Sequence, residues 1–234
     1  MIKKSGLSLI LLLLLATYIH ALNYGEIQGI IHRLVNDTDR TNPHFSDVTI
    51  STFVNLAQQE IAIYTFCLEG TTSYTIIDGQ QEYNFYDDMF VIQRITMNDV
   101  VLPEISIAKL DKDTTWQTNK SSQTPSYYYV RHTTYSIIGF NCIPSTASYS
   151  QLTIQFIKLP DDLNTDGNIP FNGLKRLYPY HSIICYFASA LLLYQDNRPI
   201  DGDRYYKMYI DRLQEMSKSI RITPNYYPSI GIGK

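Results

Sequence analysis

The chain has 234 residues, of which 44% are apolar and 18% are charged, and its formal net charge is −3 at pH 7. This composition excludes an intrinsically disordered chain and is sufficient for one large domain, or a domain with a sizeable insertion, without disulfides or metal ions. Lysine and arginine are scattered along the sequence, so no basic stripe predicts sequence-specific binding of nucleic acid.

Residues 1–21 have the three parts of a secretory signal peptide: two early lysines, an apolar run over 7–16, and a small-residue end at Ala21. The apolar run is too short for a comfortable membrane span, so we expect no stable membrane insertion. Cleavage after Ala21 would change the charge from −3 to −5, because two lysines and no acidic residue are lost. Two hypotheses stay open: a true signal peptide, or a mis-assigned start with translation beginning at Leu22.

Residues 22–69 are predicted to form a helical hairpin. The first helix covers Tyr24 to Val35. The second helix is capped by Ser46 and ends at Gly70. Its predicted buried stripe consists of Ile50, Phe53, Val54, Ala57, Ile61 and Tyr64.

Residues 70–160 change to a period of two and predict a mostly antiparallel β unit of about six or seven strands. Asp78-Gly79 and Asn98-Asp99 are turn signals that predict two hairpins. A single helical turn is expected over 106–111. The three cysteines are far apart and are expected to be small buried hydrophobic residues.

Residues 161–220 are predicted to form a second helical hairpin, with Pro179 in the first turn of its first helix and a break from Asn197 to Gly202. Pairing the outer helices brings the ends of the β unit together. The predicted fold class is therefore α+β: a four-helix scaffold of two helical hairpins with an inserted, mostly antiparallel β unit. Residues 221–234 lack periodicity and predict an extended tail.

No catalytic motif is present. The five histidines lack metal-ligand spacing and are expected at the surface or at helix caps, and no nucleophile elbow, P-loop or dinucleotide-binding glycine pattern occurs. We therefore expect no enzyme and no cofactor. Trp116 is expected to pack within its own loop, with a contact to a partner as the alternative.

One turn resembles a calcium-binding loop. Asp162, Asn164, Asp166 and Gly167 match the first places of that loop, in which carboxylate and amide oxygens surround the ion. Gly173 stands where a bidentate glutamate is needed. The sequence therefore favours a plain turn rich in Asp and Asn, with a weak calcium site as the alternative.

The order of several short segments resembles the head–tail connector or adaptor proteins of tailed bacteriophages, in particular the podovirus adaptors of the tail tubular A type. The segments are NYGEI at 23–27, NPHFSD at 42–47, FVNLAQQEIA at 53–62, the stretch 81–95, Trp116 with 125–128, and 158–181. Each is weak alone, and the resemblance rests on their order over residues 22–220.

The resemblance implies a structural virion protein that assembles in the host cytoplasm as a homo-oligomeric ring, often a dodecamer, beneath the portal. Such a ring joins the capsid to the tail, binds portal and tail nozzle or tube proteins, and lets DNA pass through its lumen. It has no cofactor and no catalytic activity. A leader is not expected in this family, so an exported or envelope-associated binding module is the alternative function.

In relatives, the C-terminal helix or tail commonly makes the contact with the portal. The resemblance therefore assigns partner binding to the end of this chain. The assigned residues are Ile220, Tyr226, Tyr227, Ile230 and Ile232.

Overall fold

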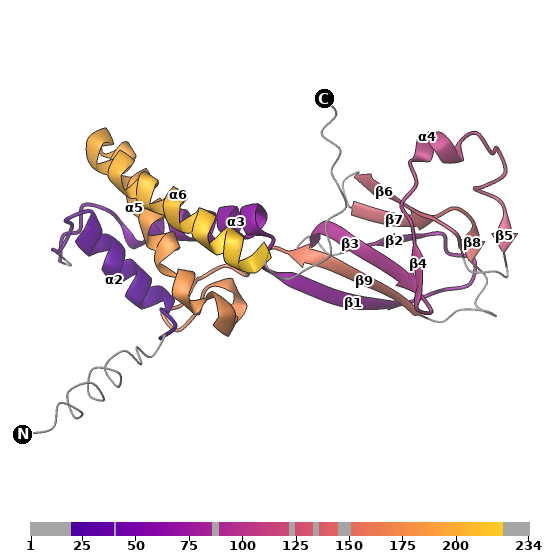
Figure 1. Ribbon diagram of the computed structural model, residues 1–234, viewed down its shortest axis with the longest axis horizontal. Helices are drawn as coiled ribbons and strands as arrows, with labels where there is room; N and C mark the ends of the chain where they lie inside the picture. Colours follow the sequence, from indigo (N-terminus) through magenta and orange to yellow (C-terminus); the bar gives the residue numbers. More distant parts are fainter. Residues whose placement is uncertain are drawn as a thin grey trace, which may run out of the picture. The chain divides into compact units, whose positions relative to one another are not determined.

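The computed structural model describes residues 20–39, 41–85, 89–121, 125–132, 136–144 and 151–221 (Figure 1). Its contacts divide the chain into two compact units, 1–58 with 161–216 and 59–160 with 217–234, which we call the helical unit and the β unit. Helices α3 (Asp47–Thr65) and α6 (Pro199–Arg221) contribute residues to both.

Helix α2 (Tyr24–Leu34) confirms the first predicted helix. The Asn23 carboxamide accepts the N–H of Glu26 at 2.9 Å, and the Glu26 carboxylate accepts the N–H of Asn23 at 2.9 Å. This capping box satisfies N–H groups that have no partner inside the helix. Ile27 and Ile31 are fully buried, and α2 packs against α5 (Ser182–Gln195).

Helix α3 begins as predicted, because the Ser46 hydroxyl accepts the N–H of Thr49 at 3.1 Å. Its predicted end at Gly70 is wrong. The helix ends at Thr65, and Phe66 follows with a positive φ of 53°. The predicted burial of Tyr64 is also wrong, since this side chain is 50% exposed.

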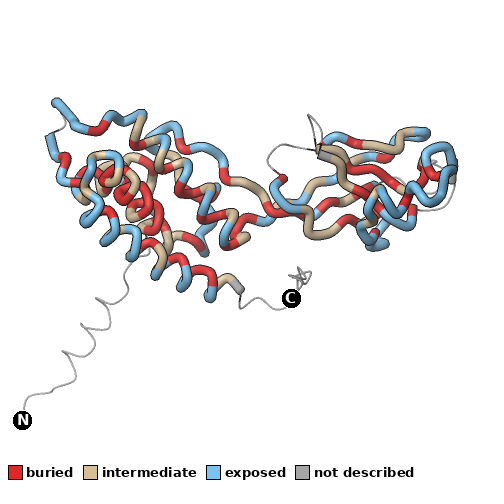
Figure 2. The backbone as a smooth tube through the Cα atoms, turned by 90° about the horizontal axis from the view of Figure 1, so that it is seen from above, coloured by how far each residue is buried: buried red, intermediate tan, exposed pale blue. Residues whose placement is uncertain are grey.

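Helix α5 is preceded by two short 3-10 helices, η1 (Phe171–Gly173) and η2 (Lys175–Tyr180). Pro179 lies in η2, so its predicted place in the first turn of the long helix is wrong. Most of α5 is buried (Figure 2). Helix α6 begins at Pro199, which has no N–H to satisfy in a first turn.

Gly202 lies inside α6 and not in the predicted break. A Cβ atom at Gly202 would lie 2.6 Å from Tyr194 Cε1, so the absence of a side chain lets the ring pack on the helix. The Tyr194 hydroxyl also donates to Asp203 at 2.8 Å, and the rings of Phe187 and Tyr209 lie 4.7 Å apart. These contacts join α5 to α6. The four-helix scaffold and the domain limits expected from the sequence stay predictions.

The β unit contains a four-stranded sheet in the order β1-β9-β3-β4 and a three-stranded sheet in the order β2-β7-β6. Both sheets are antiparallel, and a short parallel pair, β5-β8, adds to them. The described residues thus hold nine strands, more than the six or seven expected. Their bounds are β1 Glu69–Thr75, β2 Glu82–Asn84, β3 Met89–Met97, β4 Val100–Leu102, β5 Lys120–Ser121, β6 Tyr128–His132, β7 Ser136–Phe140, β8 Ile143–Pro144 and β9 Gln151–Lys158.

One predicted hairpin is confirmed and the other is wrong. Asn98 and Asp99, both at positive φ, connect β3 to β4. The turn at Asp78-Gly79 does not connect paired strands, because β1 pairs with β9 and β2 pairs with β7. It carries the chain from one sheet to the other. Gly70, the expected helix end, lies in β1 beneath the ring of Phe156, where a Cβ would be 2.6 Å from Cζ.

The two sheets bury their facing side chains in one core: Ile76, Tyr83, Phe85, Met89, Ile95, Met97, Leu102, Tyr128, Ile138, Phe140, Leu152, Ile154 and Phe156. A smaller cluster of Leu110, Trp116 and Tyr129 contains the end of the single-turn helix α4 (Ile107–Leu110). Tyr128 and Tyr129 alternate between these two clusters along β6. Trp116 is buried in this cluster and donates through Nε1 to Asp111 at 3.2 Å, so it anchors its loop, as predicted.

Candidate assembly surfaces

The loop before α3 is organised by one buried carboxylate. The Asp37 oxygens accept the N–H groups of His44 and Phe45 at 3.0 Å each, and the His32 imidazole donates through Nδ1 to Asp37 at 3.2 Å. Burial raises the pKa of Asp37, but the hydrogen bonds from Phe45 and His44 and the neighbouring His32 outweigh burial and hold it below its usual value. A charged carboxylate therefore fixes the start of α3.

His44, in the same loop, contacts Asp196 at the end of α5, with Nε2 and Oδ1 2.9 Å apart. A pocket of about 300 Å³ opens beside this pair. Its lining residues are His44, Phe45, Ser46, Thr49, Gln195 and Asp196. Within this lining the Ser46 hydroxyl accepts the N–H of Thr49 at 3.1 Å and so caps α3.

The C-terminal carbonyls of α2 are satisfied by side chains from the α5–α6 connection and α6. Arg198 donates to the carbonyl of Val35 at 3.0 Å, and the Tyr205 hydroxyl donates to the carbonyl of Leu34 at 3.2 Å. Arg198 also forms an ion pair with Asp201 at 2.7 Å. These bonds tie segments that are distant in sequence into one rigid unit.

His181 is buried at the N-cap of α5 and donates through Nδ1 to the carbonyl of Leu22 at 3.1 Å. Burial lowers the pKa of His181 to about 4, although the hydrogen bond to Leu22 opposes that shift. His32 is buried as well, so the expectation that all histidines lie at the surface or at caps is wrong for His32. Their contexts in the sequence gave no sign of the partners.

The calcium-like turn serves the start of α2. Asn168 accepts the N–H groups of Asn164 and Thr165 at 3.0 and 2.8 Å, and the carbonyl of Asp166 accepts the N–H of Gly25 at 3.2 Å. The side chains of Asp162, Asn164 and Asp166 are exposed. Within the described ranges, no group of three or more His, Cys, Asp or Glu side chains could hold a metal ion.

Apolar side chains are exposed on two helices of the helical unit. Val48 and Leu56 on α3 are 76% and 41% exposed, and Ile200 on α6 is 86% exposed. A helix that packs on a core normally turns charged or polar residues outward, so these three side chains are candidates for contacts with further protein. Sequence reasoning missed them, because all three lie outside the periodic buried stripes.

The comparison with known families decides the class of the protein. The sequence profile of the SU10 adaptor protein family matches residues 22–228. The chain belongs to the SU10 adaptor protein family. It is a structural adaptor protein of bacteriophages, as the resemblance implied. No curated protein matches the chain.

The family match covers the residues assigned to partner binding only up to position 228. Ile220 lies near the end of α6 and is partly exposed. Tyr226, Tyr227, Ile230 and Ile232 lie outside the described residues. Their role in this adaptor stays a prediction.

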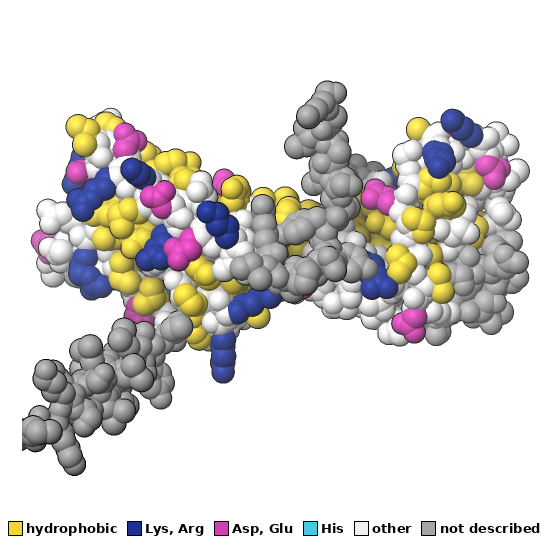
Figure 3. Space-filling model, in the orientation of Figure 1, with side chains coloured by type: hydrophobic (Ala, Val, Ile, Leu, Met, Phe, Trp, Pro, Cys, Tyr) yellow, Lys and Arg dark blue, Asp and Glu magenta, His cyan; other side chains and the backbone are white. Residues whose placement is uncertain are grey.

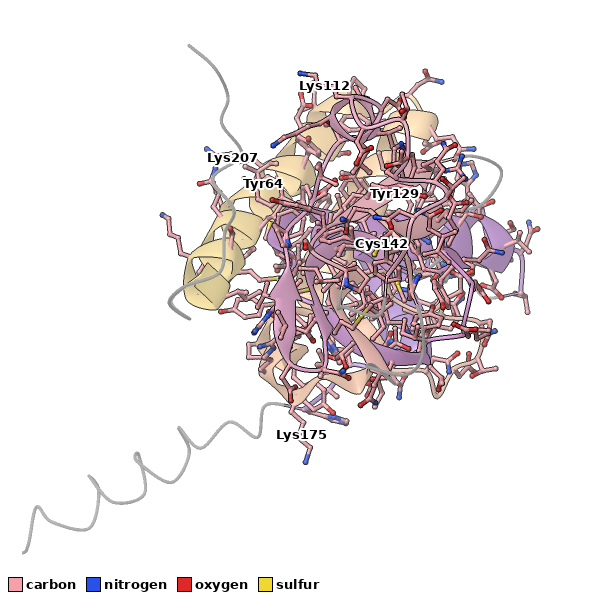
Figure 4. All side chains as sticks on the ribbon, turned by 90° about the vertical axis from the view of Figure 1, so that its right-hand side faces the viewer. Tyr64, Lys112, Tyr129, Cys142, Lys175 and Lys207 are labelled. Atoms are coloured by element: carbon pink, nitrogen blue, oxygen red, sulfur yellow. The ribbon has the colours of Figure 1, made fainter. Side chains whose placement is uncertain are left out.

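The β unit of the adaptor presents a polar cluster next to Trp116. The Tyr129 hydroxyl donates to Glu82 at 2.5 Å, and Arg131 forms an ion pair with the same carboxylate. The Trp116 and Tyr129 rings meet edge to face with centroids 5.3 Å apart. Figure 4 shows Tyr129 and Cys142 among the side chains of this unit. All of these contacts are internal, so we assign this cluster to stability.

The described helices of the adaptor differ from membrane-spanning segments in length, in hydropathy or in both. None of those in residues 20–221 that the structure describes is both long and apolar enough to cross a bilayer.

Proposed function

We propose that this chain is a head–tail adaptor that assembles as a homo-oligomeric ring, a dodecamer, beneath the portal and joins the capsid to the tail nozzle or tube. The observation that carries the proposal is the family match over residues 22–228, which includes both the helical unit and the β unit. The exposed apolar residues of α3 and α6 support association with further protein.

DNA passes through the lumen of the proposed ring without being gripped. The formal net charge of −3 and the scattered lysine and arginine residues support this role. Figure 3 shows basic and acidic side chains interspersed on the visible face of each unit. A lumen wall with acidic and basic side chains interspersed does not bind the phosphate backbone of DNA tightly.

The portal contact is assigned to Ile220 and the tail that follows it. The experiment is co-expression of the full chain with the portal protein of the same phage, followed by affinity capture and native mass spectrometry. We expect a portal-associated ring, and loss of capture after deletion of residues 222–234. Full capture by the truncated chain would show that residues 222–234 are not the portal contact. Absence of capture by the full chain would contradict the adaptor proposal.

An exported or envelope-associated binding module is the second candidate, favoured by the signal-like sequence of residues 1–21. The family match begins at residue 22, directly after the expected cleavage position. Intact-mass measurement of the protein from virions and from host-cell fractions separates the two. Export predicts a chain that begins at Leu22 outside the cytoplasm, and the adaptor function predicts the chain in virions.

A further inference from the structure

After Asp47, the outward face of α3 carries no charged side chain as far as Leu56. Val48, Thr52 and Leu56 follow one another at four-residue steps and are all exposed. The opposite face holds Ile50 and Val54, which are fully buried. An exposed acidic side chain, Asp47, stands at the N-terminal end of this face and is 74% exposed, with Oδ1 3.7 Å from His32 Nε2.

The outward face of α6 has the complementary character. Ile200, Arg204 and Lys207 recur at four- and three-residue steps and are exposed, opposite the buried Gly202 and Tyr209. Lys207 projects away from α6 (Figure 4). The face therefore begins with an apolar side chain and continues with basic ones.

The acidic residue that directly precedes Arg204 forms a hydrogen bond within its own unit. Asp203 accepts a hydrogen bond from the Tyr194 hydroxyl at 2.8 Å. The Arg204 guanidinium lies 6.0 Å from the ring centroid of Tyr205, a contact that keeps its charge. Arg204 and Lys207 thus give this part of α6 a basic outward face.

We propose that copies of this chain join through the α3 face of one copy and the α6 face of the next, with the two helices antiparallel. This inference rests on the ring assembly proposed above. In that orientation Leu56 packs on Ile200 of the next copy. At the other end, Val48 packs on the aliphatic stems of Arg204 and Lys207, whose charges meet Asp47.

The dimensions of the two faces agree. Asp47 and Leu56 are nine residues apart, and Ile200 and Lys207 are seven residues apart. At about 1.5 Å per residue these separations are roughly 13 and 10 Å, and the long basic side chains span the difference. A contact between two copies of α3 would leave Asp47 without a basic partner from that face.

Two different faces meet at this contact, and the proposed ring uses it head to tail, as a heterologous interface. Each copy offers one α3 face and one α6 face, so addition of copies continues until a rotation closes the ring. An isologous contact would stop at a dimer. The proposed interface therefore accounts for a ring made of one kind of chain.

The experiment is disulfide trapping in the full-length chain. Leu56→Cys and Ile200→Cys are purified separately, mixed in equal amounts at high concentration and oxidised with copper phenanthroline. The three native thiols are buried, and peptide mass spectrometry identifies which positions become linked. We expect a link between positions 56 and 200 in the mixture, at least tenfold above any link in either variant alone.

A matched control is Val101→Cys, which replaces a half-exposed residue on β4, and we expect it to link to neither variant. No link between 56 and 200, or a dominant link of 56 to 56, would overturn the proposal. Asp47→Lys should lower the yield severalfold, and Arg204→Asp with Lys207→Asp in the other copy should restore it. A yield unaffected by Asp47→Lys would overturn the antiparallel arrangement.

Portal capture distinguishes this inference from the proposed function. Capture of portal by a chain that gives no link between positions 56 and 200 leaves the adaptor function standing and removes this interface. A link without portal capture keeps the interface and removes the adaptor function.

Discussion

The buried imidazole of His181 donates a hydrogen bond to the backbone carbonyl of Leu22, with Nδ1 and O 3.1 Å apart. Leu22 is also the first residue of the family match. A carbonyl can only accept, so Nδ1 carries the proton and Nε2 is left as an acceptor, for which no partner occurs among the described residues. The neutral imidazole thereby fixes the start of the folded adaptor.

The His181 contact predicts a pH dependence of stability. In the folded chain the pKa is about 4, against 6.5 for an unperturbed histidine, so the unfolded chain takes up a proton first as pH falls. The contribution of this residue to stability is therefore full above pH 6.5 and is lost progressively towards pH 4. Between pH 6.5 and 5 the loss is about 2 kcal/mol.

Urea unfolding at pH 7.5 and pH 5 measures this loss. His181→Asn keeps a donor near Leu22 but does not titrate, so its loss between the two pH values should be smaller than that of the wild type by about 2 kcal/mol. Equal pH dependence in His181→Asn and the wild type would contradict the prediction.

Removal of residues 1–21 is expected to leave the stability of the folded chain unchanged within about 0.5 kcal/mol. The Leu22 carbonyl and the capping box of Asn23 with Glu26 are all retained. Among the described residues, the removal breaks the ion pair of exposed His20 with Glu26, whose Nε2 and Oε1 atoms are 3.8 Å apart, and an exposed pair of this kind stabilises little. Chemical unfolding of the chains that begin at Met1 and at Leu22 measures the difference.

Asn23→Ala is the positive control for that comparison. It removes the acceptor of the Glu26 N–H, and should cost about 1 kcal/mol in either background. A large loss of stability on removal of residues 1–21 would show that the leader is part of the fold.

Local signals were sufficient to predict the helices and one hairpin. The cap at Ser46 and the turn at Asn98-Asp99 each depend on residues within four positions of one another, and both are observed. The partner of β1 was not predictable in this way. Thr72 pairs with Ile154, which is distant in sequence, and only burial of both sheet faces in a shared core selects that pairing.

The candidate surface was predicted less well than the fold. Periodicity identifies residues that face the core, and it gives no information on why Val48 or Ile200 is tolerated in water. The roles of buried His32 and His181 depend on backbone groups that the fold brings to them. The sequence pattern YPYH around His181 was the one available sign, since aromatic neighbours favour burial.

Asp37→Asn is expected to lower the free energy of unfolding at pH 7 by about 2–3 kcal/mol. The asparagine can accept with only one of its two polar atoms, so the N–H of His44 or that of Phe45 loses its partner. The contact with His32 is weakened as well. Chemical denaturation of both proteins measures the cost.

The pH dependence of this variant follows from the same carboxylate. The folded pKa of Asp37 lies below its unfolded value of 3.8, so its stabilisation is present above pH 3.8 and is lost as pH falls through the folded pKa. The stability of Asp37→Asn should therefore lack this decrease at acidic pH. Asp211→Asn, at an exposed position of α6, should retain the decrease. An equal decrease of stability at acidic pH in both variants would refute the role of Asp37.

Gly139→Ala tests the packing of the three-stranded sheet. Gly139 lies directly opposite Tyr129 in the β6–β7 register, and a Cβ at Gly139 would lie 2.1 Å from Tyr129 Cζ. The aromatic ring must therefore move, which disturbs its contact with Trp116 and its hydrogen bond to Glu82. We expect a loss of about 1–3 kcal/mol, measured by chemical denaturation.

The cause of that loss is tested with a double-mutant cycle. If the clash with Tyr129 is responsible, Gly139→Ala should cost much less in a Tyr129→Ala background, because the ring that occupies the space is gone. Gly167→Ala is the matched control, since no heavy atom lies within 4 Å of its added Cβ, and it should change stability by less than about 0.5 kcal/mol. Additive costs of Gly139→Ala and Tyr129→Ala would instead place the strain in the backbone of β7 and contradict a steric role for the tyrosine ring.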